Sequence, residues 1–169
     1  MPFARRRPKA EEEKCSDFAK ARSRALDILS AQDVCTEDLY RRLCNNYTEQ
    51  AAAFAVAEMV ELDCVNDERY ASNCARKLLD ARKSRRAAAQ YMRQKGLDAV
   101  HIEQALDEIY ADDGDGENPE LTAAAELVEK RYRKKLEDGR RDLVVAALMR
   151  RGFAYPVIKE AIQRAEEEE

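Results

Sequence analysis

The sequence predicts an all-α protein in which three tandem three-helix repeats form an elongated, curved array. Residues that favour helices are abundant, chiefly Ala, Leu, Glu, Lys and Arg, whereas five glycines and four prolines are few for a fold rich in tight turns. Apolar residues recur every three or four positions along almost the whole chain, which is the helical period. Hydrophobic residues make up 45% of the 169 residues, so the chain can build a core.

The first repeat is predicted over residues 17–64, after a disordered N-terminal arm at 1–16 that carries three consecutive arginines. Apolar side chains at helical spacing indicate a first helix over about 17–31. Thr36 is the expected N-cap of a short second helix, and Thr48 is the expected N-cap of the third.

The second repeat is predicted over residues 65–110. Asn66 is placed to cap its first helix, and Ser84 opens a shorter second helix. Gly96 supplies the left-handed residue that ends this second helix, and Asp98 then caps the third.

A flexible acidic linker is predicted at 111–118, followed by the third repeat at 119–169, which ends in an acidic tail. Asn118 precedes Pro119, a cap followed by a proline in the first turn of a helix. The second helix of this repeat stops at Gly152, and its third helix starts near Pro156.

The register of the three segments supports a true repeat. The turn Met92–Leu97 aligns with Leu148–Phe153, and apolar residues recur at equal distances beyond the turn in all three segments. One three-helix unit of this length has a marginal core, so stacked neighbours are expected to bury the remaining apolar surface. The equivalent apolar positions are Ala52, Ile102 and Ile158, then Val56, Leu106 and Ile162.

The net charge of −4 conceals a segregated distribution. Residues 76–95 hold eight basic side chains and one acidic, and residues 130–151 hold nine basic and three acidic. Residues 27–68 and 98–129 are instead predominantly acidic. The cationic blocks are either helix faces paired with these acids or a surface for an anionic partner. The candidate binding residues are Arg82, Lys83, Arg85, Arg86, Arg93, Lys95, Arg140, Arg141, Arg150 and Arg151.

No sequence motif indicates a catalytic, cofactor-binding or metal-binding site. The five cysteines contain no C-x-x-C pair, there is a single histidine, and neither a phosphate-binding loop nor a nucleophile–base pair can be identified. We therefore expect no catalytic, cofactor or metal site. Without an apolar run of about 18 residues or a secretory leader, we expect a cytoplasmic protein with no membrane partner. Without a heptad seam, we expect a monomer.

Tyrosines offer no predicted stacking platform. Tyr70, Tyr91 and Tyr110 all lie at apolar spacing and are expected in the core. Tight binding of single-stranded nucleic acid through base stacking is therefore not indicated.

The stretch Val65–Ala71 resembles the "L-D-D-E-R-F-A" motif of the RecX family, and the basic residues of Arg82–Arg86 and of Arg93–Leu97 follow it at the family's spacing. Upstream, Ala25–Leu29 and Leu39–Leu43 fit the same family. The resemblance is close over about residues 18–110 and loose over 119–165. It implies tandem three-helix repeats and a regulator that binds RecA recombinase and its filament on single-stranded DNA. It further implies inhibition of the ATPase, coprotease and strand-exchange activities of RecA.

Two other functions remain open from the residues themselves. The basic blocks would suit a nonspecific binder of single- or double-stranded DNA, although the acidic stretches would repel the same phosphates. A helical-repeat scaffold for another protein is the third possibility.

Overall fold

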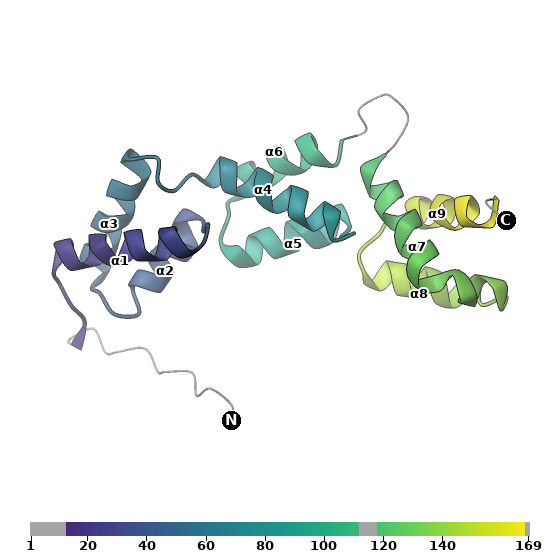
Figure 1. Ribbon diagram of the computed structural model, residues 1–169, viewed down its shortest axis with the longest axis horizontal. Coiled ribbons are helices and arrows are strands. Elements are labelled where there is room, and N and C mark those ends of the chain that lie inside the picture. Colours follow the sequence, from purple (N-terminus) through teal and green to yellow (C-terminus); the bar gives the residue numbers. More distant parts are fainter. Residues whose placement is uncertain (1–12, 112–117, 168–169) are drawn as a thin grey trace. The chain divides into compact units, whose positions relative to one another are not determined.

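The computed structural model describes residues 13–111 and 118–167, and these residues form nine helices (Figure 1). Their contacts divide the chain into two compact units. The predicted arginines of the N-terminal arm, most of the acidic linker and the last two glutamates lie outside the described residues. The predicted all-α class is confirmed. In chain order the helices are α1 (Phe18–Ala31), α2 (Thr36–Leu43), α3 (Glu49–Glu61), α4 (Asp67–Asp80), α5 (Arg85–Lys95), α6 (Ala99–Ile109), α7 (Pro119–Glu137), α8 (Arg141–Arg150) and α9 (Tyr155–Glu167).

The first unit contains α1, α2, α3, the beginning of α4 and the turn Lys95–Leu97. Small side chains line the face between α1 and α3, where Ala21, Ala25, Ala52 and Ala55 are all fully buried. Because alanines leave little side-chain volume between two helices, these helices can approach closely. Larger side chains from α2 and α3 complete this core, among them Leu39, Leu43, Val56 and Met59.

The second unit contains most of α4 and α5, together with α6 to α9. Helices α8 and α9 pack on the long helix α7 around a core that includes Val128, Val144, Leu148, Ile158 and Ile162. Helices α4, α5 and α6 bury a further set of side chains, among them Ala71, Cys74, Met92, Ile102 and Leu106. The predicted division into repeats at 64/65 and around 111–118 stays a prediction. The contacts group the turn Lys95–Leu97 with the first unit.

Most of the predicted helix boundaries are confirmed. Gly96 and Gly152 have φ angles of +97° and +90°, the left-handed conformation expected where α5 and α8 end. Five of the six predicted capping residues accept a hydrogen bond from a backbone N–H in the first turn of their helix. These five are Thr48, Asn66, Ser84, Asp98 and Asn118.

The predicted cap at Thr36 is wrong. Thr36 is the first residue of α2, and Cys35 occupies the N-cap position without a capping side chain. A carboxylate from another helix replaces it, since Asp67 Oδ1 accepts from the Thr36 N–H at 2.7 Å and from the Thr36 hydroxyl at 2.9 Å. A local sequence pattern cannot predict a capping partner that lies 31 positions away in the chain.

The first residues of α2 form what we term the Cys35 contact, which lies within the first unit. The Cys35 thiol donates to the carbonyl oxygen of Lys95 at 3.1 Å, while Asp67 caps the same helix. Gly96 lies so close that a Cβ atom there would be 2.5 Å from Glu37 Cγ. Glycine is therefore required at this position by both backbone conformation and space.

The same arrangement recurs within the second unit, where we term it the Ser84 contact. The fully buried Ser84 hydroxyl donates to the carbonyl oxygen of Arg151 at 2.9 Å. Glu120 Oε1 accepts from the backbone N–H of Arg85 at 3.0 Å, as Asp67 does for Thr36. A Cβ atom on Gly152 would lie 2.8 Å from Ser84 Oγ. The two contacts thus use the same positions of the repeat.

Candidate binding surface

A hollow of about 490 Å³ in the second unit brings together the turn after α4, the middle of α7 and the end of α8. We call it the cationic hollow, because six basic side chains line it and no carboxylate does. Four of the six belong to the residues predicted from sequence as binding candidates. The six are Arg82, Lys83, Lys130, Arg131, Arg150 and Arg151.

The turn after α4 places two of these cations. Arg82 has a φ angle of +57°, which turns the chain at the end of the helix, and the Lys83 N–H returns to the Leu78 carbonyl oxygen at 2.9 Å. The hydroxyl of buried Tyr110 donates to the Lys83 carbonyl oxygen at 3.1 Å. Burial strongly raises the pKa of this phenol, so it remains a donor across the physiological range.

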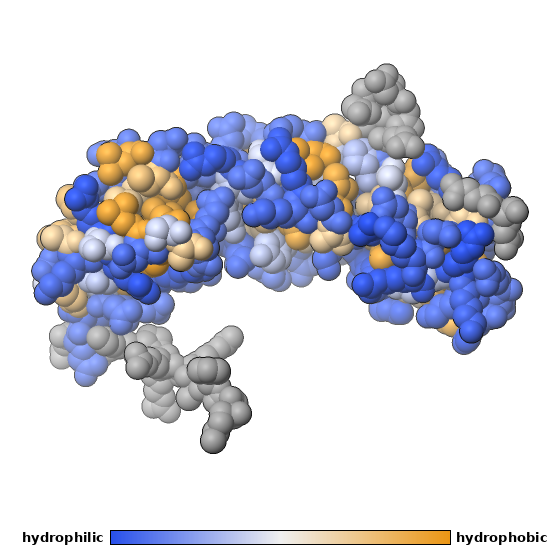
Figure 2. All heavy atoms as spheres, viewed as in Figure 1, coloured by the Kyte–Doolittle hydropathy of each residue, from blue (hydrophilic) through white to orange (hydrophobic). Residues whose placement is uncertain are grey.

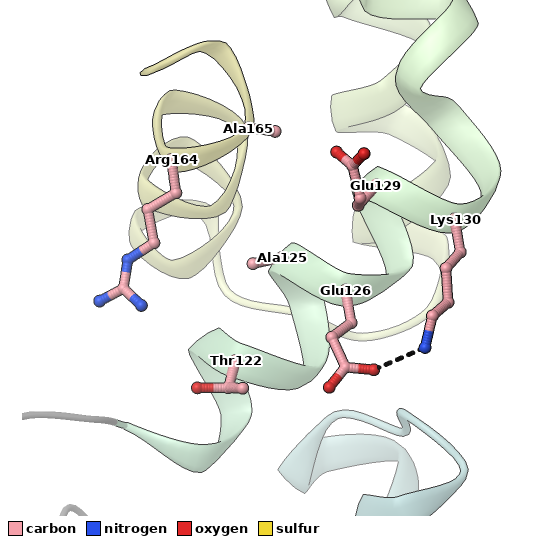
Figure 3. A pocket seen from close by; sticks show the side chains of 7 residues that line it. All are labelled: Thr122, Ala125, Glu126, Glu129, Lys130, Arg164 and Ala165. Carbon is pink, nitrogen blue, oxygen red and sulfur yellow. Dashed lines mark hydrogen bonds and ion pairs between the residues drawn. The ribbon is translucent and has the colours of Figure 1, made fainter. Parts of the chain in front are cut away.

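One acid on the edge of the hollow is shared by two cations. Glu126 accepts from Lys130 Nζ at 3.0 Å and from Arg82 Nε at 2.7 Å; the bond to Lys130 is drawn in Figure 3. These hydrogen bonds, from Lys130 first and Arg82 second, lower the pKa of Glu126. Since one carboxylate faces two cations, this group retains a positive charge.

The remaining cations of the hollow are held differently. The Arg151 guanidinium lies over the Tyr132 ring at 5.5 Å and donates to the Ala147 carbonyl oxygen at 3.3 Å. Neither contact neutralises its charge. Across residues 13–111 and 118–167, no carboxylate forms an ion pair with Lys83, Arg131 or Arg150. The hollow can therefore accept an anionic group of a partner.

The other sequence candidates lie elsewhere. Arg85 forms ion pairs with Glu103 at 3.1 Å and Asp107 at 2.7 Å, which join α5 to α6. Arg141 is paired with Glu166 at 2.7 Å. The alternative of mutual ion pairing thus describes these two arginines.

Four further candidates lie outside the hollow. Arg86 and Arg93 are exposed on α5, and Arg140 is exposed just before α8. Lys95 is half-buried, and its carbonyl oxygen accepts from the Cys35 thiol and from Arg41. Lys130 and Arg131 are the cations that the predicted set omitted. The basic residues of α7 surround the helix, so sequence periodicity could not tell which of them face the hollow.

A second, smaller pocket of about 240 Å³ between α7 and α9 is of mixed charge (Figure 3). Glu126, Glu129, Lys130 and Arg164 line it beside small residues. Glu129 accepts from Arg133 at 2.6 Å, and Arg164 donates to Glu160 at 3.3 Å. Acids and bases balance here, so this pocket has no preference for an anion.

The prediction that the aromatic residues are buried is wrong for Tyr91. Its side chain is 41% exposed on α5. Tyr110 is buried as predicted, whereas Tyr70 is only half-buried. Phe18, Phe54 and Tyr155 are also exposed. Exposed aromatic side chains on which a base could stack are therefore present, contrary to the prediction.

The described part of the chain contains no group of three or more His, Cys, Asp or Glu side chains arranged to hold a metal ion. None of the helices found between residues 13 and 167 combines the length and apolar character needed to cross a membrane.

Comparison with known proteins agrees with the helical-repeat architecture. The family model for the second three-helix domain of RecX matches residues 66–106. The regulatory protein RecX of Clostridioides difficile (strain 630) is 26% identical over 151 residues, which cover 87% of this chain and 68% of that protein.

Two crystal structures resemble the fold. RecX from Lactobacillus salivarius has a TM-score of 0.76 at 22% identity, with 88% of this chain and 96% of that chain covered. A second structure, of regulatory protein RecX, has a TM-score of 0.72 at 25% identity, with 85% and 71% covered. The family model, the sequence relative and the two folds agree in their similarity to RecX regulatory proteins.

Proposed function

We propose that this protein binds RecA recombinase and its filament on single-stranded DNA and inhibits the ATPase, coprotease and strand-exchange activities of RecA. It would act in the cytoplasm, in homologous recombination, DNA repair and the SOS response, as a regulator without catalytic activity of its own. The similarity to RecX regulatory proteins is the observation that carries this proposal.

The cationic hollow supports a contact with an anionic part of that filament. Lys83, Arg131 and Arg150 lack a carboxylate partner within the described residues, and all three are exposed. Phosphate contacts by such side chains position a protein on nucleic acid without reading its sequence. We therefore assign the hollow to the DNA backbone within the filament.

The same hollow favours a second candidate, a protein that binds bare nucleic acid nonspecifically. Binding would then depend on phosphate neutralisation alone, and its affinity would fall steeply with salt. The two candidates differ in whether RecA is required for the effect.

The test measures ATP hydrolysis by RecA of the same organism on single-stranded DNA, titrated with this protein. The informative variant is Arg131→Glu with Arg150→Glu, because these side chains lie on helices and form no ion pair given by the structure. Reversing Arg82 or Arg85 instead would break contacts to Glu126 or to Glu103 and Asp107. The matched control, Lys77→Glu with Lys159→Glu, changes the charge equally at exposed positions outside the hollow.

We expect the wild type and the control to inhibit hydrolysis and the double variant to require at least about tenfold more protein. Inhibition that the double variant retains in full would keep the function and reject the hollow. An absence of inhibition, together with salt-dependent binding to bare DNA, would support the second candidate. In a DNA-only titration, losing two phosphate contacts lowers the slope of log affinity against log salt by about 1.4.

A further inference from the structure

The first unit carries an apolar groove that the proposed contact with filament DNA does not use. The groove lies between α2 and α3 and has a volume of about 530 Å³. Its apolar lining comes from Tyr40, Ala53, Val56, Ala57 and Val60. Apolar side chains also gather on the surface over α1 and α3, whereas most of the remaining visible surface is polar (Figure 2).

Helix α3 is apolar on both sides. Its buried side holds residues such as Ala55 and Met59, which belong to the core. Its other side carries Ala53, Ala57 and Val60, spaced four and three positions apart and therefore aligned on one face. Val60 is 48% exposed, and the two alanines are exposed as well. An amphipathic surface helix would place polar residues here, so this face is suited to a partner.

The acids beside the groove indicate what the partner carries. Glu37 and Glu61 line the groove, and no cation does. Arg41 approaches Glu37 only to 3.9 Å, and no ion pair involving Glu61 is found in the described chain. Phosphates of nucleic acid or lipid would be repelled from this surface. A helix with an apolar stripe flanked by lysines or arginines would complement both the lining and the charge.

We propose that the α2–α3 groove is a docking site for a basic amphipathic helix of a partner protein. The 13 residues of α3 span about 20 Å, enough to contact three to four turns of such a helix. This inference does not depend on RecA or on the cationic hollow, so either can fail without the other.

The experiment measures binding of a fluorescent 18-residue helical peptide of leucines and lysines, with the leucines on one face, to the full-length protein by anisotropy. Ala57→Arg places a bulky cation in the groove, and Ala19→Arg makes the same change at an exposed position of α1 outside it. We expect Ala57→Arg to weaken peptide binding by about tenfold or more and Ala19→Arg by less than about twofold. Glu61→Gln should weaken binding by about threefold, and raising the salt should remove this difference.

Several results would overturn the proposal. One is equal binding by the Ala57→Arg and Ala19→Arg proteins, and another is equal binding of a peptide whose leucines are replaced by serines. A wild type that dimerises in sedimentation while Ala57→Arg does not would make a second copy of this chain the occupant. A several-fold gain in peptide affinity when Arg5, Arg6 and Arg7 are changed to Ser would instead identify the chain's own N-terminal segment as a competitor.

Discussion

Gly152→Ala tests the Ser84 contact, in which the residue before α5 is hydrogen-bonded to the end of α8. Two separate effects oppose an alanine here. Its φ of +90° disfavours any residue with a Cβ atom, and the added Cβ would lie 2.8 Å from Ser84 Oγ. The hydroxyl would have to move, although it is fully buried and bonded to the Arg151 carbonyl oxygen.

The expected cost follows from these two effects. The left-handed backbone costs about 1 kcal/mol or slightly more for a residue with a Cβ atom. Disturbing a buried hydroxyl and its acceptor costs about 1–3 kcal/mol. Gly152→Ala should therefore destabilise the protein by about 2–4 kcal/mol. Gly139→Ala is the control, because its φ is +71° and no atom lies within 4 Å of its added Cβ, so only the backbone cost of about 1 kcal/mol applies.

Urea unfolding followed by far-ultraviolet circular dichroism gives the free energy of unfolding of each variant. The Ser84→Ala background removes the hydroxyl that the new Cβ would strike. The cost of Gly152→Ala should then fall by about 1 kcal/mol, a coupling of the size expected for residues in contact. Equal costs for Gly152→Ala and Gly139→Ala, or strictly additive costs in the double variant, would refute the reasoning.

Three further substitutions test other contacts of the second unit. Burial raises the pKa of Glu120. Its contribution to folding stability is therefore present at low pH and is lost as the pH rises through the raised folded-state pKa. The stability of Glu120→Gln relative to wild type should thus increase between about pH 4 and pH 7. Hydrogen bonds from Lys130 and Arg82 lower the pKa of Glu126, so its contribution to folding stability is present at neutral pH and is lost as the pH falls. The stability of Glu126→Gln relative to wild type should therefore decrease as the pH rises from about 4 to about 7. Urea midpoints at both pH values check this pair, and equal trends would contradict it. Tyr110→Phe removes the bond to the Lys83 carbonyl oxygen and should cost about 1 kcal/mol in urea unfolding; a variant as stable as wild type would show that the bond contributes nothing.

The helix boundaries could be predicted because their causes are local. Asp98 and Asn118 cap helices that begin within three residues of them, and Gly96 and Gly152 end helices through their own backbone conformation. The prediction of a cap at Thr36 failed because Cys35 occupies the N-cap position. The carboxylate that accepts from the first turn of α2 comes from Asp67, which is distant in sequence.

The binding surface could be predicted only in part, because charge density along the chain does not reveal ion pairing. Arg85 and Arg150 both belong to strongly basic stretches of sequence. In the fold, Arg85 faces two carboxylates of α6, whereas no ion pair involving Arg150 occurs in the parts of the chain that the structure describes. Which basic residue is free depends on helices that pack beside it.

The Ser84 contact and the cationic hollow have a common cause. Arg151 immediately precedes the left-handed glycine at the end of α8, and its carbonyl oxygen accepts from Ser84. This bond fixes the backbone of Arg151, whose guanidinium lines the hollow over Tyr132. A substitution at Ser84 should therefore change stability and binding together, whereas one at Arg150, whose backbone lies outside the contact, should change binding alone. Comparing the two sites in the same DNA and urea experiments separates a cation that is positioned by the fold from one that is merely present on the surface.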